Sequence, residues 1–397
     1  MSDPDRLDDT ALLEMLDTGG MLRAVASAAA QVREAVARTL EAGLPELVAD
    51  GRPRAVVVCG VGAAAAAGDV LAALCAAGGP APVFVHRGFG LPGWVGAVDL
   101  VVAVSCSGSE PEPLSALEQA VHRGCRLVVV GGAGSPLADL GERGRALFVP
   151  IPVGRPARAS LWACLVPLVV AADALGLLQA PAQTLEATAT VLESVAERCR
   201  IDADALVNPA KRLALDLDGP LPLVWGTTPL TGAVAARFAS QLGENARQPA
   251  VVGVLPEAAY HQAAILQPVG PGYVGGDDRP PRDRYVDGSP SFGDGDDFFR
   301  DRALDAEPPA RPALVLLRDT EEHPAVTRSA EAATRLAHEG GLSVHELSAE
   351  SGSALERLAL LVGLTDYASV YLALLQGTNP GAVDAVALLR PSVGARR

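Results

Sequence analysis

Short valine-rich runs that alternate with alanine-rich stretches constrain the fold of this chain more than any other feature. Five such runs lie at residues 55–59, 82–85, 99–104, 126–130 and 146–151, and helical stretches separate them. Strands that are buried on both faces of a parallel sheet are apolar along their whole length, unlike the alternating strands of antiparallel sandwiches. The pattern therefore predicts an α/β fold with a doubly wound parallel sheet.

The same rhythm restarts in the second half of the chain. Apolar runs at residues 221–225, 250–254, 313–317 and 342–347 follow a helical stretch at 185–199, and a helix over 353–375, capped by Ser353, closes the fold. We predict an N-terminal helical lead-in at 1–48 with one amphipathic helix at 21–46, a first domain at 49–200 and a second at 201–397. Residues 270–311, rich in Asp, Gly and Pro, predict a solvated insertion.

Charge and composition exclude several classes of function. The chain has 397 residues and a formal net charge of −15, so neither nucleic acid nor an anionic membrane surface is an expected partner. The apolar stretch at 159–178 contains Asp173, which is costly in lipid, and is predicted to be a buried core helix. The six cysteines form no Cys-x-x-Cys pair and the N-terminus lacks a signal-peptide core, so we expect a cytoplasmic protein. The scattered histidines have no ligand spacing, and no metal site is predicted.

Glycines directly after the first strand are a candidate ligand-binding turn. Gly60 and Gly62 would let the backbone approach an anion at the start of the next helix, although glycine also serves ordinary tight turns. The acidic ribose partner of a dinucleotide site is missing, because the second strand ends in Val85-His86-Arg87. Binding of NAD is therefore disfavoured.

A serine-rich turn after the third strand is the second candidate. Ser105, Ser107 and Ser109 bring three hydroxyls to the carboxyl end of a parallel strand, where phosphate groups are commonly held. Ser109 alone is equally explained as the cap of the helix that follows. That alternative leaves Ser105 and Ser107 unexplained, so the turn predicts a phosphate cradle.

Several stretches together carry a family resemblance. The serine turn and its helix resemble the sugar isomerase (SIS) domain. Four further stretches, at 156–161, 241–246, 254–257 with His261 nearby, and 366–380, resemble the bifunctional phosphoglucose/phosphomannose isomerase family, in the family's order. The resemblance implies two flavodoxin-like SIS domains in tandem, a homodimer, no cofactor, and a small sugar phosphate as substrate.

The resemblance also implies roles for individual residues. Glu244 matches the base that moves a proton between carbons 1 and 2 of the sugar, and Arg158 matches the charge beside the enediolate. His261 matches the ring-opening group if one extra residue is allowed after Pro256-Glu257. Gly60, Gly62 and the serines at 105, 107 and 109 would surround the sugar and its phosphate.

Three departures from the family pattern leave a second function open. Ala64 stands where the family has a phosphate-binding serine, Glu110 replaces a threonine, and residues 382–390 lack the functional lysine of the terminal helix. The alternative is a catalytically degenerate SIS protein that binds a sugar phosphate as a sensor or partner subunit.

Overall fold

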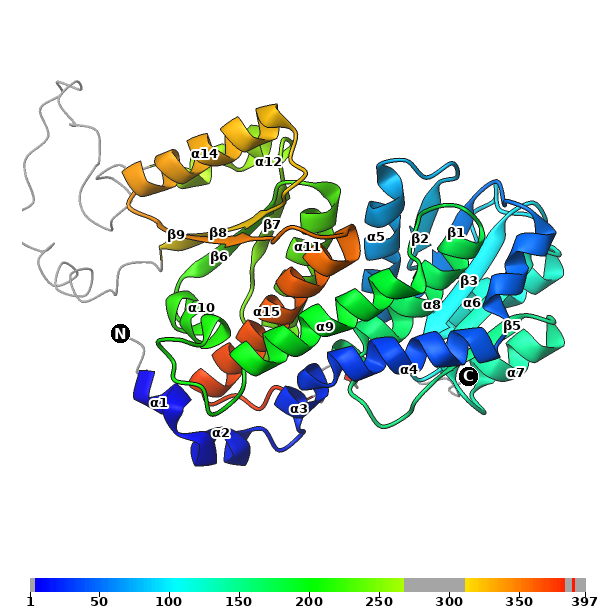
Figure 1. Ribbon diagram of the computed structural model, residues 1–397, viewed down its shortest axis with the longest axis horizontal. Coiled ribbons are helices and arrows are strands. Elements are labelled where there is room, and N and C mark those ends of the chain that lie inside the picture. Colours follow the sequence, from blue (N-terminus) through cyan, green and yellow to red (C-terminus); the bar gives the residue numbers. More distant parts are fainter. Residues whose placement is uncertain (1–3, 268–310, 383–387, 390–397) are drawn as a thin grey trace, which may run out of the picture.

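Two parallel sheets organise the chain (Figure 1). The computed structural model describes residues 4–267, 311–382 and 388–389. The predicted insertion at 270–311 therefore lies almost wholly outside the described residues. The described sheets contain all nine predicted strands and only parallel pairings, so the predicted α/β class with two doubly wound sheets is confirmed. The predicted domain limits at 48/49 and 200/201 stay predictions.

The first sheet has the order β2-β1-β3-β4-β5. Its strands are β1 (Val56–Cys59), β2 (Val83–His86), β3 (Leu100–Ser105), β4 (Arg126–Gly132) and β5 (Leu147–Ile151). Val56 lies opposite Val83 on one side and Leu100 on the other, and all residues of β1 and β3 are buried. The chain reverses direction along the sheet between β1 and β3, so their carboxyl ends form the switch point where doubly wound sheets bind ligands.

The second sheet has the order β7-β6-β8-β9. Its strands are β6 (Leu221–Gly226), β7 (Val251–Val254), β8 (Pro312–Arg318) and β9 (Ser343–Ser348). Its switch point lies between β6 and β8, where Thr227 and Thr228 follow β6.

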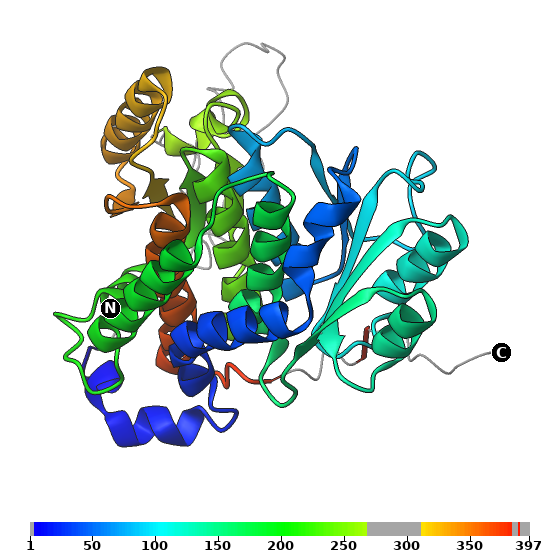
Figure 2. The ribbon, with the colours of Figure 1, turned by 45° about the vertical axis from the view of Figure 1, so that its right-hand side comes forward.

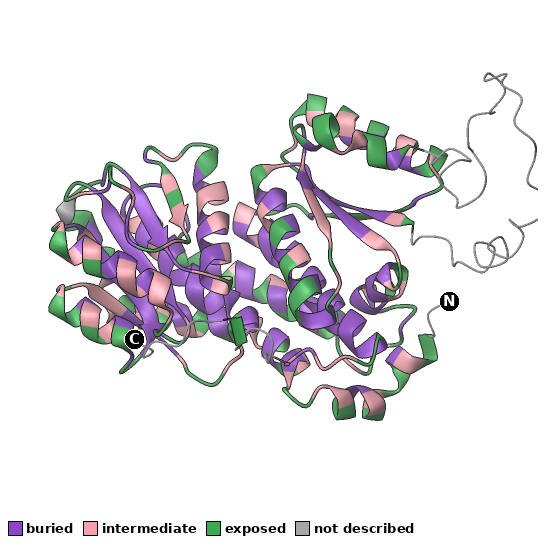
Figure 3. Cartoon of the chain, turned by 180° about the vertical axis from the view of Figure 1, so that it is seen from behind, coloured by how far each residue is buried: buried purple, intermediate pink, exposed green. Residues whose placement is uncertain are grey.

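The helices between the two sheets form the main core (Figures 1 and 3). They are α4 (Ala28–Glu41), α5 (Ala63–Ala76), α8 (Leu161–Ala174), α9 (Ala182–Arg198), α10 (Pro209–Leu217), α11 (Pro229–Ala246) and α15 (Ala354–Leu375). Outer helices cover the opposite faces and make two smaller cores. These are α6 (Pro111–His122) and α7 (Pro136–Arg143) on the first sheet, and α12 (Ala258–His261), η3 (Ala263–Leu266) and α14 (Pro324–Glu339) on the second.

The predicted lead-in helix at 21–46 is wrong in its continuity. It is divided at Ser27 into α3 (Met21–Ala26) and α4. The Ser27 hydroxyl donates to the Ala24 carbonyl and so competes with the backbone hydrogen bonds of a continuous helix. It ends at Glu41, because Gly43 adopts a left-handed φ of 74° and a 3₁₀ turn, η1 (Leu44–Asp50), follows.

The N-terminal helices α1 (Pro4–Asp8), α2 (Thr10–Leu16) and α3 wrap around the end of α15 (Figure 2). Lys211, the one lysine in the sequence, fixes this arm. Its ammonium group is completely buried, donates to the carbonyls of Ile201 and Ala203, and lies 3.3 Å from Asp8 Oδ1. The only lysine therefore has a structural role.

Apolar helices of this chain are buried inside the fold. The stretch at 159–178 forms α8, whose residues are nearly all buried, as predicted for a core helix. Among the described residues, α15 alone is long and apolar enough to cross a membrane, and it is wholly buried between the other helices. A core helix passes the same test of length and composition.

Candidate active site

The serine turn after β3 is held tightly against the neighbouring helix α7. Gly108 has a φ of +71°, and its carbonyl accepts the Leu137 N–H. A Cβ at this glycine would lie 2.0 Å from Ser135 Oγ, so only glycine fits. The exposed hydroxyls of Ser107 and Ser109 hydrogen-bond each other at 2.7 Å, and Ser105 beneath them is 2% exposed.

Glu110 folds back into this turn. It occupies the N-cap position of α6, but its side chain makes no capping bond to the helix. Its carboxylate instead accepts a hydrogen bond from the Ser105 hydroxyl, while Ser105 Oγ accepts the Gly108 N–H at 2.6 Å. The alternative that Ser109 caps α6 is thereby wrong, since Glu110 is the N-cap and Ser109 pairs with Ser107.

Arg158 joins three parts of the chain that are far apart in sequence. It lies in the short turn η2 (Ala157–Ala159), and its side chain is 7% exposed. Its Nη1 donates to the carbonyls of Glu244 and Pro380 and to Asn245 Oδ1, and its Nη2 donates to the Ala382 carbonyl. Its Nε lies 3.5 Å from Glu244 Oε2. The guanidinium plane is therefore fixed, with one edge directed at the Glu244 carboxylate.

A polar row on α11 supports Arg158 from behind. Arg237, Gln241 and Asn245 are spaced four residues apart, so they share one face of the helix, and all three are buried. Arg237 Nη2 and Gln241 Nε2 both donate to the Arg158 carbonyl, at 3.0 and 2.7 Å. The backbone and the side chain of Arg158 are thus both held.

An ion pair with α15 completes this network. Asp366 accepts two hydrogen bonds from Arg237, at 3.0 and 2.7 Å, and both side chains are more than nine-tenths buried. Burial raises the pKa of Asp366, and the Arg237 charge opposes that shift. Asn245 Nδ2 donates to Ser369 Oγ at 2.9 Å, which ties the same two helices together.

Two thiols connect the serine turn to α8. Cys106 Sγ lies 3.5 Å from Cys164 Sγ, and Cys164 is fully buried. The hydrogen bond with Cys106, together with burial, raises the pKa of the Cys164 thiol well above its usual range, against the effect of Arg237. The charge of Arg237 acts to lower the pKa of the Cys164 thiol, and the charge of Glu110 acts to raise it.

The predicted catalytic residues differ in their surroundings. Glu244, near the end of α11, has a side chain that is 41% exposed, so it faces Arg158 on one side and solvent on the other. His261 is the last residue of α12 and is 64% exposed. Its ring pairs with Glu257 at 2.6 Å, and among the described residues no contact joins it to Glu244 or Arg158. The structure thus brings Arg158 and Glu244 together but not His261.

The glycine turn after β1 is dominated by packing. A Cβ at Gly60 would lie 2.9 Å from the Val104 carbonyl oxygen and from the Ala64 side chain, so Gly60 allows β1 and β3 to approach. Gly62 has a φ of +56° with open space around it, and it precedes α5 without a side-chain cap. The first amide groups of α5 therefore lie beside the switch point of the first sheet.

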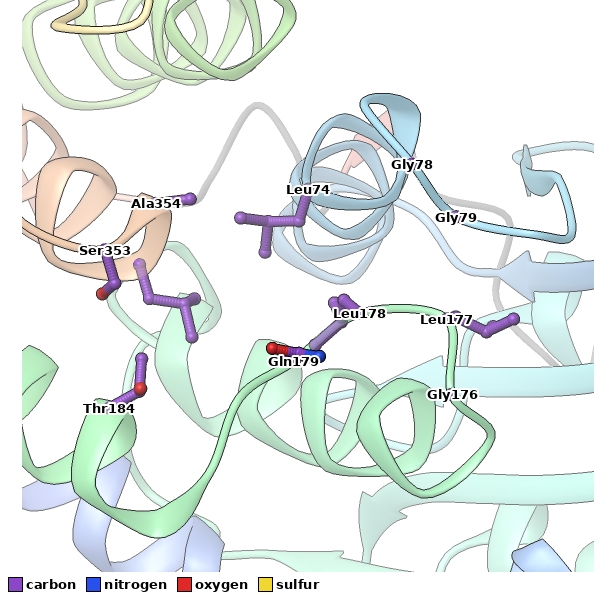
Figure 4. A pocket seen from close by; sticks show the side chains of 11 residues that line it. Leu74, Gly78, Gly79, Gly176, Leu177, Leu178, Gln179, Thr184, Ser353 and Ala354 are labelled. Carbon is purple, nitrogen blue, oxygen red and sulfur yellow. The ribbon is translucent and has the colours of Figure 1, made fainter.

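Two cavities elsewhere contain none of the predicted site residues. One, of about 440 Å³, lies between the end of α5, the loop after α8 and the start of α15, where Leu74, Gln179 and Ser353 line it (Figure 4). Another, of about 400 Å³, lies between the N-terminal helices and Tyr367 and Tyr371 of α15. Among the described residues no cluster of three or more His, Cys, Asp or Glu side chains could hold a metal ion.

Comparison with known proteins shows which sugar-phosphate isomerases the chain is similar to. Residues 206–393 match the bacterial phospho-glucose isomerase C-terminal SIS domain. A bifunctional phosphoglucose/phosphomannose isomerase from Caldicellulosiruptor bescii is 28% identical over 335 residues, which cover 84% of this chain and 88% of the relative. The protein of the same name from Aquifex aeolicus is 25% identical and covers 77% of this chain. Over most of its length the chain is similar to bifunctional phosphoglucose/phosphomannose isomerases, with divergent sequence.

The fold of the chain agrees with a solved structure. A hypothetical protein from Thermus thermophilus aligns with a TM-score of 0.65 and 17% identity, covering 96% of this chain and 93% of the other. At 17% identity the comparison shows a shared fold only, and the alignment covers both sheets.

The divergence is visible at the first switch point. Ala64 is 3% exposed and packs against Gly60, so it brings no hydroxyl to the turn. The Glu110 carboxylate accepts the hydrogen bond that the Ser105 hydroxyl donates. Most of the segment at 382–390, where the family resemblance implies a lysine, lies outside the described residues.

The support around Arg158 was not predicted from the sequence. Gln241 and Asn245 fall inside a stretch that carried the family resemblance, and Asp366 begins another, yet none was assigned a role. A usable signal was the spacing of Arg237, Gln241 and Asn245, since large polar residues recur every four positions on one face of the helix.

Proposed function

We propose that this protein is a sugar-phosphate isomerase that interconverts glucose 6-phosphate or mannose 6-phosphate with fructose 6-phosphate. The single observation that carries the proposal is the pairing of Glu244 with Arg158, whose Nε lies 3.5 Å from Glu244 Oε2. Curated relatives from two organisms bear the name of this activity over most of the chain. A carboxylate beside a fixed cation is what proton transfer next to a carbonyl requires.

The chemistry follows from these two side chains. Glu244 removes the proton from carbon 2 of the open-chain aldose, and the electron pair moves through carbons 2 and 1 onto the carbonyl oxygen, which gives an enediolate. Arg158 stabilises the negative charge that develops on oxygen. The hydroxyl proton on the oxygen of carbon 2 passes to the oxygen of carbon 1, Glu244 returns its proton to carbon 1, and the carbonyl forms at carbon 2. No atom is gained or lost, so no cofactor is required.

Binding and ring opening involve other elements. Ser107 and Ser109 are exposed at the switch point of the first sheet and would contact the phosphate. Ring opening is proposed for His261 on the family resemblance alone, because within one chain its ring contacts Glu257 at 2.6 Å and lies apart from Glu244 and Arg158. We also propose that the protein is a homodimer, which sedimentation of the purified chain would test.

The test is a coupled assay that follows glucose 6-phosphate formation from fructose 6-phosphate. Glu244→Gln should lower kcat by about 10²-fold or more, the usual contribution of a general base. Glu339→Gln is the matched control, because Glu339 is an exposed carboxylate at the end of another helix, α14. Equal turnover by wild type and Glu244→Gln would overturn the assignment.

A second candidate function is sugar-phosphate binding without catalysis. It is favoured by the occupied hydroxyl of Ser105 and by the buried Ala64. Calorimetry with fructose 6-phosphate separates the two: heat of binding without turnover in the folded protein supports this candidate.

A further inference from the structure

The hydroxyl of Ser105 has no hydrogen-bonding capacity left for an anion. A serine hydroxyl carries one donor proton, and here that proton is directed at the Glu110 carboxylate. Its oxygen also accepts the Gly108 N–H at 2.6 Å. An anionic ligand that needs this hydroxyl must first displace Glu110.

The other groups of the turn are only partly engaged. Ser107 and Ser109 share one hydrogen bond between their hydroxyls, and the Ser109 N–H donates to Ser107 Oγ. One of the two hydroxyl protons therefore remains available at an exposed position. The start of α6 lies beside the turn; Pro111 and Pro113 have no N–H, so of its first three residues only Glu112 has an amide donor. The turn thus retains donors for an anion, but it holds a carboxylate among them.

From this geometry we propose that Glu110 is a specificity-determining residue that competes with the anionic group of the substrate for the serine turn. This inference rests on the proposed function in taking a sugar phosphate as the ligand. The carboxylate both occupies the Ser105 donor and places a negative charge next to the incoming phosphate. Glu110 therefore weakens binding of the sugar phosphate and leaves the proton transfer at Glu244 unaffected.

Two substitutions separate occupancy from charge. Glu110→Ala removes the charge and frees the Ser105 hydroxyl. Glu110→Gln removes the charge but keeps an oxygen that can accept from Ser105. Unit charges a few ångströms apart interact by about 1 kcal/mol or more, so each substitution should lower KM for fructose 6-phosphate by about fivefold or more. The kcat should stay within about twofold, and the Ala variant should show the larger decrease.

Glu112→Gln is the control. Glu112 lies in the first turn of the same helix, so its substitution removes one negative charge from the same helix end. Its KM should stay within about twofold of wild type. A KM that is unchanged or raised in both Glu110 variants, or lowered equally by Glu112→Gln, would overturn the proposal.

Binding of inorganic phosphate makes the test independent of catalysis. Titration calorimetry on wild type and the three variants should give tighter phosphate binding for Glu110→Ala and Glu110→Gln alone. If neither wild type nor any variant turns over fructose 6-phosphate, but the two Glu110 variants bind phosphate more tightly than the other proteins do, the proposed function fails and the role of Glu110 stands. If turnover is present and the order is absent, the role of Glu110 fails.

Discussion

Breaking the ion pair between Arg237 and Asp366 should be among the most destabilising changes in this molecule. The two side chains are 4% and 9% exposed, and two hydrogen bonds of 3.0 and 2.7 Å join them. Removing one partner of such a pair leaves an uncompensated charge in the interior, which costs about 3–5 kcal/mol of the free energy of unfolding. Replacing both by apolar residues of similar volume removes that penalty.

The two single substitutions should differ in their dependence on pH. Asp366→Ala leaves the Arg237 guanidinium, which does not lose its proton in proteins, so the pair no longer titrates in this variant. In wild type the raised pKa of Asp366 means that protonation favours the folded state, so the cost of Asp366→Ala should grow as the pH falls toward 4. Arg237→Met leaves the Asp366 carboxylate, whose pKa burial already raises above the usual 3.8. The folded variant then binds a proton at a higher pH than the unfolded chain does. Its stability relative to wild type should therefore improve as the pH falls toward 4.

Chemical denaturation followed by circular dichroism measures these differences. We expect Asp366→Ala and Arg237→Met to lose about 3–5 kcal/mol at pH 7, and the double variant Arg237→Met/Asp366→Leu to recover most of that loss. A loss below about 1 kcal/mol in both single variants would refute the reasoning. So would a double variant that loses the sum of the two single effects, because the penalty would then lie in packing rather than in charge.

Three further outcomes are expected. Lys211→Met should lower the free energy of unfolding by about 1–3 kcal/mol, since two buried carbonyls lose their donor, whereas the exposed neighbour Arg212→Met should leave denaturation curves unchanged. Burial acts to raise the pKa of Glu322, but hydrogen bonds led by that of Arg318 outweigh it and hold the pKa at about 2. The stability advantage of wild type over Glu322→Gln should be full above pH 4.5 and disappear as the pH falls toward 2, and a constant difference would contradict it. Iodoacetamide should modify Cys106 first in the native protein, because the other five cysteines are buried, and mass spectrometry would reveal any other order.

The strands were predictable because a strand that is buried on both faces consists almost entirely of apolar residues. Residues of β1 and β3 are apolar without alternation, and such runs have few other interpretations between helical stretches. The single helix expected at 21–46 failed at Ser27, where a local hydrogen bond from the side chain competes with the helix. The helical spacing of apolar residues continues through such a break, so the sequence pattern does not reveal where the helix is interrupted.

The candidate site was predictable only in part. Arg158 and Glu244 were found through family motifs, and the structure places them in contact. The direction of the Glu110 side chain was not predictable, because an N-cap position favours an outward, capping conformation, while the bond to Ser105 depends on how the turn is held by α7. Tertiary contacts decide such a choice, and the local sequence does not contain them.

The division of the site between two sheets explains how its parts can diverge separately. Glu244 and the row behind Arg158 belong to α11, which follows β6 of the second sheet, whereas the serine turn follows β3 of the first. Arg158 is held by carbonyls and by Gln241, and none of these bonds involves the serine turn. Preorganised charge stabilises a transition state only while its support is intact, and this support does not depend on Glu110. Substitutions at the turn are therefore expected to alter which anion binds and how tightly, while the proposed proton-transfer pair, Glu244 and Arg158, keeps its geometry.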